Sequence, residues 1–148
     1  MNQALTKPQG VSDEYPATPL QVGMVLNSER SPSKGVEIEQ VVIELERPVK
    51  IDELQSAFEQ VSQRHPVLRS AFRWEVNQSQ PTLIQYITAS APIEITHIHP
   101  QDFERFLLED RQRGFELHRP PLQRVTLIDT QGDGDGDCFI WTFHHAIL

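Results

Sequence analysis

At 148 residues, 38% hydrophobic and 23% charged, the chain is long enough for one globular domain with a core of its own. The formal net charge of -8 argues against a nucleic-acid or anionic-membrane surface, because either partner requires a basic patch. The single cysteine, Cys138, excludes an internal disulfide, and the lack of both a run of ~18 apolar residues and a signal-peptide core predicts a cytoplasmic location.

The first part of the chain combines a lead-in, a helix and a strand. Residues 1–14 show no hydrophobic periodicity and are interpreted as a flexible lead-in to one domain that spans residues 15–148. Apolar residues at helical spacing predict a helix over about residues 19–28, where a proline suits the first turn. Over residues 36–47 apolar side chains mostly alternate with acidic ones, which predicts a half-buried strand closed by Pro48.

The period then changes to that of a second helix, which is expected to end near Arg64. Asp52 followed by Gln55 is typical of a capping box, and an apolar stripe predicts that this helix packs on a sheet. Short strands separated by turn-rich segments follow, and they are predicted at residues 71–75, 82–88 and 93–97.

A further helix and two strands complete the predicted domain. Pro100 can open the helix and Gly114 can close it. Residues 122–128 predict a strand, and residues 138–143 are apolar on both faces, as in a central strand covered on both sides. We therefore predict an α+β fold, a mixed sheet with helices packed on it. The paired histidines after the last strand can then face a cleft from a rigid mount.

A repeat of glycine and aspartate at residues 132–137 imitates the start of a calcium-binding EF-hand loop. Cys138 stands where the sharp turn of that loop needs glycine, and His144 stands where a bidentate glutamate closes the site. We interpret the segment as a flexible hairpin turn between two strands. A zinc site that includes His97 and His99 is not expected either, because the spacings match no Cys/His metal pattern.

Four segments in chain order resemble signature motifs of the condensation domains of nonribosomal peptide synthetases. The segments spread across most of the chain, and all of the motifs belong to the N-terminal lobe of that family. They are residues 18–24 (TPLQVGM, similar to TPxQxGM), 64–72 (RHPVLRSAF, similar to RHxxLRxxF), 115–124 (FEL and PLQR, similar to F-D-L…P-L-x-R) and 144–148 (HHAIL, the start of HHxxxDG).

This resemblance implies a fold and a reaction. The fold is a chloramphenicol-acetyltransferase-like lobe, the first half of a two-lobed condensation domain. The reaction is amide-bond formation, in which the amine of a carrier-bound acceptor attacks an acyl or peptidyl thioester on an upstream carrier protein. Both substrates arrive on phosphopantetheine arms, so no directly bound cofactor or metal is expected. The implied partners are peptidyl and aminoacyl carrier proteins and a second lobe.

The resemblance also assigns roles to four residues. His145 matches the second histidine of the motif and is expected to be catalytic, either accepting a proton or orienting the amine. His144 matches the first histidine and is expected to support it. Arg64 and Arg69 match arginines that hold the active-site region together through the aspartate of the motif. The alternative for these arginines is a solvated helix end that favours positive charge.

The aspartate and glycine of the HHxxxDG motif are absent from the sequence, which stops at Leu148. We therefore expect a buried arginine without its partner, at a cost on the order of 3–5 kcal/mol, and an isolated chain that is inactive. One alternative is a noncatalytic module that docks a carrier protein or a separate second lobe, marked by a large exposed apolar face. Others are a related acyltransferase or epimerisation domain and an unrelated α+β ligand-binding domain.

Overall fold

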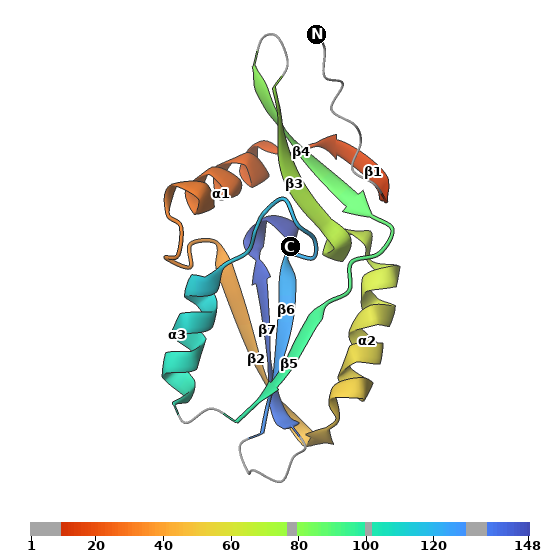
Figure 1. Cartoon of the computed structure of the whole chain (residues 1–148), viewed down its shortest axis with the longest axis vertical. Coiled ribbons are helices and arrows are strands. Elements are labelled where there is room, and N and C mark those ends of the chain that lie inside the picture. The colour runs from red at the N-terminus through yellow and green to blue at the C-terminus, as the bar shows by residue number, and fades with distance from the viewer. Residues whose placement is uncertain (1–9, 77–79, 100–101, 130–135) are drawn as a thin grey trace.

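The computed structural model describes residues 10–76, 80–99, 102–129 and 136–148. Within them lie two β-sheets and three α-helices (Figure 1). In chain order the elements are β1 (Val11–Pro16), α1 (Pro19–Arg30), β2 (Ile38–Val49), α2 (Ile51–Arg64), the 3-10 helix η1 (Pro66–Arg69), β3 (Ser70–Val76), β4 (Pro81–Thr88), β5 (Glu94–Ile98), α3 (Phe103–Arg113), β6 (Gln123–Ile128), β7 (Gly136–His144) and the 3-10 helix η2 (His145–Ile147).

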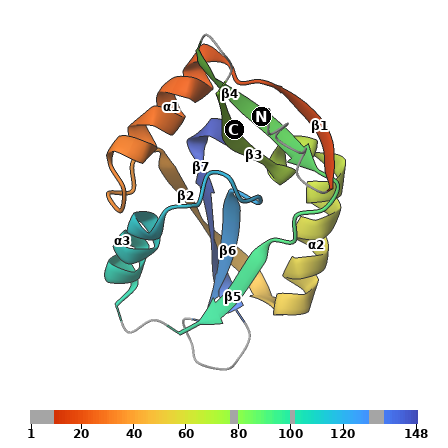
Figure 2. The same cartoon turned by 45° about the horizontal axis from the view of Figure 1, so that its top comes forward.

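The larger sheet has the strand order β2-β7-β6-β5, and β7 is therefore an inner strand. Its pairs are antiparallel except for β5 with β6, which is parallel. The smaller sheet has the order β1-β4-β3 and is wholly antiparallel. Figures 1 and 2 show the larger sheet lying between α2 and α3, while α1 lies beside the smaller sheet. The predicted α+β class with helices packed on a mixed sheet is confirmed.

Both faces of the larger sheet are covered at its inner strands β6 and β7, as the doubly apolar sequence of β7 predicts. Val125 and Leu127 of β6 pack with Leu54 of α2 on one face. Ile128 and Ile140 belong to a second cluster on the other face, where the apolar side of α3 covers them. Because the side chains of a strand alternate between faces, β7 needs apolar residues at nearly every position.

A third cluster joins the two sheets and lies under α1. It contains Val25 of α1, Phe72 of β3 and Phe143 of β7. The backbone N–H of Phe72 donates to the carbonyl of Leu117 at 2.7 Å, which ties the smaller sheet to the segment before β6. The end of β7, itself part of the larger sheet, is therefore packed against the smaller sheet and α1.

Local sequence explains where the helices begin and end. Thr18 caps α1, because its hydroxyl accepts from the Gln21 N–H while the Gln21 side chain accepts from the Thr18 N–H. The capping box predicted at Asp52 is wrong, since α2 begins at Ile51 and places Asp52 within its first turn. There its negative charge favours the positive end of the helix dipole without capping it.

Two predicted boundaries shift in the structure. The lead-in expected over residues 1–14 ends earlier, because Val11–Pro16 forms β1 and pairs with β4. The strand expected to close at Pro48 continues to Val49. Because β2 is an edge strand, one of its sides has no neighbouring strand, and a proline that faces this open side removes no hydrogen bond of the sheet.

The expectations around α3 and the β6–β7 turn have mixed outcomes. Gly114 ends α3 with a φ of 60°, as predicted. Asp102 caps the start of that helix, and Pro100 lies outside the described residues. Most of the Gly-Asp segment also lies outside them, but β6 and β7 pair antiparallel on either side of it, as a hairpin requires.

Candidate active site

The two adjacent histidines lie where β7 passes into η2, and they point into different surroundings. His144 is the last residue of β7, and its side chain is buried. His145 is the first residue of η2, and 45% of its side chain is exposed. The difference follows from the change of backbone direction at the end of the strand, which sends neighbouring side chains apart.

His144 is fixed by hydrogen bonds to both nitrogens of its ring. The Ala146 N–H donates to Nδ1 at 3.1 Å, so Nδ1 carries the lone pair and the proton resides on Nε2. Nε2 lies 2.8 Å from the hydroxyl of Ser28, which itself donates to the carbonyl of Val36. His144 therefore connects the end of β7 to α1 and to the loop before β2.

Burial keeps the His144 ring neutral. Desolvation lowers the pKa of His144 to about 4, helped by the neighbouring His145 and opposed by the negative charge of Glu37. At neutral pH the residue is an uncharged ring with both nitrogens engaged. It is suited to hold structure and not to exchange protons.

His145 has the opposite character, with an accessible ring held from one side by Glu37. The His145 N–H donates to the Glu37 carbonyl at 2.8 Å. In addition, the carboxylate oxygen Oε2 of Glu37 lies 3.7 Å from Nδ1 of His145. The other carboxylate oxygen accepts from the side-chain amide of Asn27 at 3.0 Å.

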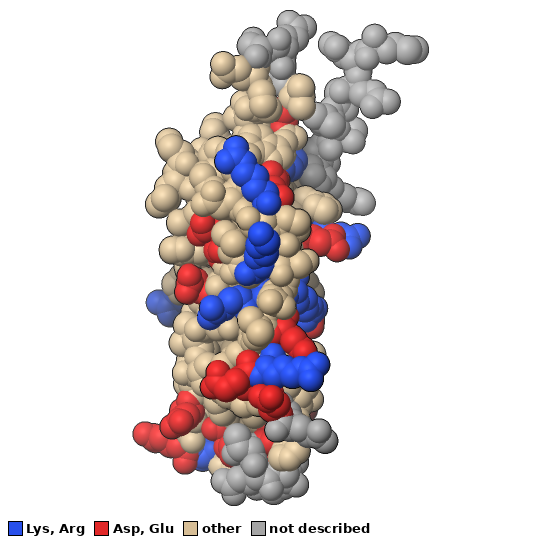
Figure 3. All heavy atoms as spheres, turned by 90° about the vertical axis from the view of Figure 1, so that its left-hand side faces the viewer, with Lys and Arg blue, Asp and Glu red and all other residues tan. Residues whose placement is uncertain are grey.

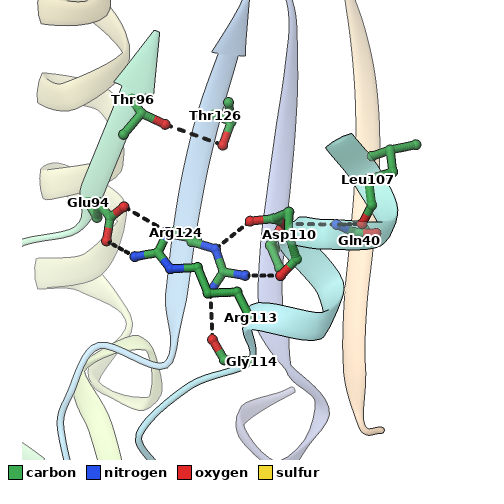
Figure 4. A network of polar contacts seen from close by, with 10 residues as sticks. Gln40, Glu94, Thr96, Leu107, Asp110, Arg113, Gly114, Arg124 and Thr126 are labelled. Atoms are coloured by element: carbon green, nitrogen blue, oxygen red, sulfur yellow. Dashed lines mark hydrogen bonds and ion pairs between the residues drawn. The ribbon is translucent and has the colours of Figure 1, made fainter. Parts of the chain in front are cut away.

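The strand that carries the histidines is anchored by a buried polar network on the α3 side of the sheet (Figure 4). Asp110 of α3 accepts from Arg124 of β6 at 2.7 Å and from the Thr142 hydroxyl of β7 at 2.6 Å. Gln40 of β2 donates to the same carboxylate at 2.7 Å. The network therefore joins one helix to three strands, and Thr142 lies only two residues before His144.

The charges in this network are matched. Burial alone raises the pKa of Asp110, but the hydrogen bonds from Arg124, Thr142 and Gln40 outweigh it and hold the pKa below its ordinary value. The guanidinium of Arg124 also donates to the carbonyl of Gly114 at 2.8 Å and stacks 4.4 Å from the ring centre of Phe115. A buried ion pair with these additional partners has little need of water.

The two arginines of the RHPVLRSAF segment make no contact with the paired histidines in the described part of the chain. Arg64 is exposed at the end of α2. Arg69 is buried, and its guanidinium donates to the carbonyls of Ser62, Gln63 and Thr88. Arg69 has no carboxylate partner among the described residues, but it is not left without hydrogen bonds, because three backbone carbonyls accept from its guanidinium.

A cleft of about 480 Å³ opens beside the buried histidine. His144 forms part of its wall together with Ser28, Phe72, Trp74 and Phe115. Arg69 lines a different cavity, between α2 and the segment before β5. The structure therefore brings His144 and His145 together with α1 and Glu37, and it does not bring them to either arginine.

Other site types find little support among the described residues. No group of three or more His, Cys, Asp or Glu side chains there is close enough to hold a metal ion. Burial raises the pKa of the Cys138 thiol, which makes it a poor nucleophile. In the described part of the chain no helix is long and apolar enough to cross a membrane. Figure 3 shows Lys and Arg side chains interspersed with Asp and Glu on the side that carries α1 and α3.

Sequence reasoning missed two residues of the site, Glu37 and Asn27. Neither belongs to a motif. Glu37 contacts His145 only because β2 pairs with β7 in a register that places Ile38 opposite His144, and Asn27 contacts the Glu37 carboxylate. Asp110 was missed for the same reason, since a single acidic residue on a helix carries no sign of burial.

Comparison with known proteins identifies the family. The Condensation domain family matches residues 11–148. Bacitracin synthase 3 of Bacillus licheniformis is 31% identical over 137 residues, which are 90% of this chain and 2% of that protein. The starter condensation domain of rhizomide synthetase superimposes with a TM-score of 0.70 at 19% identity, over 91% of this chain and 34% of that one.

The epimerization domain from the third module of tyrocidine synthetase B shares the fold as well. It has a TM-score of 0.66 at 21% identity, over 90% of this chain and 29% of that one. The chain thus spans about a third of such domains and a few per cent of the curated synthetase. With the family match over nearly its whole length and the paired histidines at the end of β7, the chain belongs to the condensation domain family.

Proposed function

We propose that the chain supplies the N-terminal lobe of a condensation domain that forms amide bonds between carrier-bound substrates. The observation that carries the proposal is the contrast between the two histidines: His144 is locked and neutral, and His145 is accessible at the end of an inner strand. An accessible imidazole on a rigid backbone is what an acid–base or orienting group requires.

The proposed chemistry uses only the Nε2 atom of His145. That atom orients the amine of the acceptor or takes its proton while the nitrogen attacks the thioester carbonyl of the donor. The new bond is the C–N bond of the amide, and the C–S bond breaks. The phosphopantetheine sulfur leaves as a thiol after it receives the proton that the amine has lost. Both substrates are tethered to carrier proteins, so the lobe needs no cofactor of its own for this step.

Positioning sets the limit of what the isolated lobe can do. Acyl transfer between two tethered substrates gains much of its rate from holding the reacting atoms at near-bonding distance. About two thirds of the related condensation domain lies outside the part that this chain matches. We therefore propose that the 148 residues alone do not catalyse condensation and that activity requires the complementary lobe.

The test is a condensation assay with two carrier proteins, one loaded with an acyl donor and one with an aminoacyl acceptor. The chain is supplied together with a C-terminal lobe from a related condensation domain, and the amide product is detected by mass spectrometry. His145→Ala is expected to abolish the product, whereas His97→Ala, an exposed histidine on β5, is expected to retain it. Product from the chain without the second lobe would contradict the requirement for two lobes.

The epimerisation alternative can be separated in the same assay. An epimerising lobe would change the configuration of a carrier-bound residue without joining two substrates. Chiral analysis of the released amino acid, beside mass analysis of the peptide, distinguishes the two reactions. The fold does not, because the tyrocidine epimerization domain shares it.

A noncatalytic docking module is the second candidate, and exposed apolar residues on β2 favour it. Val41, Val42 and Ile43 are 39%, 44% and 36% exposed, on an edge strand of the larger sheet. Exposed apolar residues on an edge strand mark surfaces that pair with another chain. This candidate predicts binding of a carrier protein or second lobe by calorimetry with no product formed and no effect of His145→Ala.

A further inference from the structure

Three segments far apart in the sequence meet around the accessible imidazole of His145. Asn27 comes from α1, Glu37 from the turn that leads into β2, and His145 from η2. The turn contacts His145 twice, through the Glu37 carbonyl to the His145 N–H at 2.8 Å and through Oε2 to Nδ1 at 3.7 Å. Asn27 Nδ2 donates to the second carboxylate oxygen at 3.0 Å, which fixes the orientation of the carboxylate.

The backbone at Glu37 supports a specific reason for this arrangement. Its φ is 60°, in the left-handed region that residues with a Cβ seldom occupy. Gly35, two residues earlier, has a φ of 67° and adopts the same left-handed conformation without strain, because glycine has no Cβ. A glutamate in such a conformation is held there by its surroundings, and strained positions of this kind cluster at functional sites.

The Glu37 carboxylate lies on the Nδ1 side of the His145 ring, with Oε2 3.7 Å from Nδ1. A negative charge near Nδ1 favours a proton on that nitrogen, and the lone pair then resides on Nε2. The adjacent ring, that of His144, is neutral and engaged at both nitrogens. The arrangement of carboxylate, imidazole and free Nε2 has the logic of a base that is oriented by a third group.

We infer that Glu37 is a positioning residue that holds His145 in the Nδ1–H tautomer, so that Nε2 is available to the amine of the acceptor. The inference rests on the proposed function for its consequence in catalysis, but the tautomer itself can be measured in the isolated chain. It also assigns to Asn27 the task of keeping the carboxylate turned toward the ring.

The first test is the nitrogen chemical shifts of the His145 ring in long-range proton–nitrogen spectra of the isolated chain. The wild-type chain is expected to show mainly the Nδ1–H form, whereas a free imidazole prefers the proton on Nε2. In Glu37→Asn the shorter side chain no longer reaches the ring, and the Nε2–H form should predominate. Asparagine tolerates a positive φ, so this variant is expected to remain folded.

Glu39→Asn is the matched control, because Glu39 is an exposed glutamate on β2 two residues away. Its spectra should match those of the wild type. An unchanged His145 tautomer in Glu37→Asn, or an Nε2–H form in the wild type, would overturn the inference.

The second test is the condensation assay in the presence of the second lobe. Glu37→Asn is expected to lower kcat by about tenfold or more with little change in KM, while Glu39→Asn leaves both unchanged. A tautomer that shifts while kcat stays at the wild-type value would overturn the positioning role and leave the proposed function intact. A wild-type lobe pair that forms no product would overturn the proposed function. The tautomer measurement would then still test whether Glu37 orients the His145 ring.

Discussion

Thr142 inside β7 and His145 just after its end have different surroundings although they are only three positions apart. Thr142 donates to a buried carboxylate that also accepts from Arg124 and Gln40, so each polar group there has a short, fixed partner. His145 has a half-exposed ring and one carboxylate at 3.7 Å. The first region supplies rigidity, and the second supplies an imidazole that is accessible from outside. A rigid strand interior allows the strand end to stay open.

The buried arginines on the two sides of the larger sheet show a related contrast. Arg124 faces α3 and pairs with the carboxylate of Asp110. Arg69, beside α2, donates only to backbone carbonyls in the described part of the chain. Carbonyl partners carry no net charge, so Arg69 is held by hydrogen bonds alone, whereas Arg124 is held by hydrogen bonds and by an ion pair. Substitutions of single residues in these two groups separate the stability that the ion pair contributes from that of the hydrogen bonds.

The largest effect is expected at the centre of the buried network. Asp110→Ala leaves Arg124 buried without its carboxylate and removes the acceptor of Thr142, which should destabilise the chain by about 3–5 kcal/mol. Urea denaturation followed by circular dichroism measures the change. Asp52→Ala, at an exposed position in the first turn of α2, is the control and should change stability far less. If the two variants lost equal stability, the buried network would not be the anchor of β7.

A pH dependence of nearly the same size is expected from His144 at the boundary between the two regions. Its pKa is about 4 in the folded chain and 6.5 ordinarily, so between these values the unfolded chain binds a proton that the folded chain does not. Stability from this residue is fully present above pH 6.5 and is lost as the pH falls toward 4, by roughly 3 kcal/mol in all.

Denaturation at a series of pH values tests this expectation. His144→Asn should flatten the dependence between pH 4 and 6.5, whereas His97→Ala, at an exposed position, should leave it unchanged. Asp110 adds a separate loss below pH 3.8, because its lowered pKa stabilises the fold only while the carboxylate is ionised. A wild-type profile that is flat from pH 6.5 to 4 would contradict the neutral, buried state of His144.

Arg69 is expected to have an intermediate effect. Arg69→Met keeps much of the side-chain volume but removes hydrogen bonds to the carbonyls of Ser62, Gln63 and Thr88, at a cost of about 1.5–3 kcal/mol. The neighbouring Arg64→Met, at an exposed position, should stay within roughly 0.5 kcal/mol of the wild type. Melting temperatures of the two variants provide the comparison, and equal values would mean that carbonyl bonding of Arg69 contributes little.

The sequence predicts the elements of the fold well and the contacts of the site poorly. Hydrophobic period and turn residues place the helices and most strands, because burial on one or two faces determines which positions are apolar. The doubly apolar run after Cys138 predicts that β7 is an inner strand, and the structure confirms it. The division of the strands into two sheets was not predicted, since local patterns do not encode which strands pair.

The partners of the charged residues depend on that same pairing. Arg69 belongs to a motif whose aspartate partner is not in the sequence, and local patterns do not predict that the fold places its guanidinium against the end of α2 and β4, where carbonyls are within reach. No local pattern marks Glu37, because a single glutamate two residues after a glycine resembles any surface turn. Its contact with His145 exists only once β2 and β7 are in register.

The smallest effect on stability is expected where the effect on catalysis is largest. His145→Ala removes a half-exposed ring with one carboxylate contact and should change stability by no more than about 0.5 kcal/mol. Urea denaturation of this variant beside His144→Asn places the two adjacent histidines on one scale. A loss at His145 as large as that at His144 would mean that the exposed ring supports the fold. A negligible loss of stability in His145→Ala, together with abolished catalysis, means that the end of β7 stays in place without the His145 ring. The stability of the lobe then comes from the interior of the strand and its buried polar network.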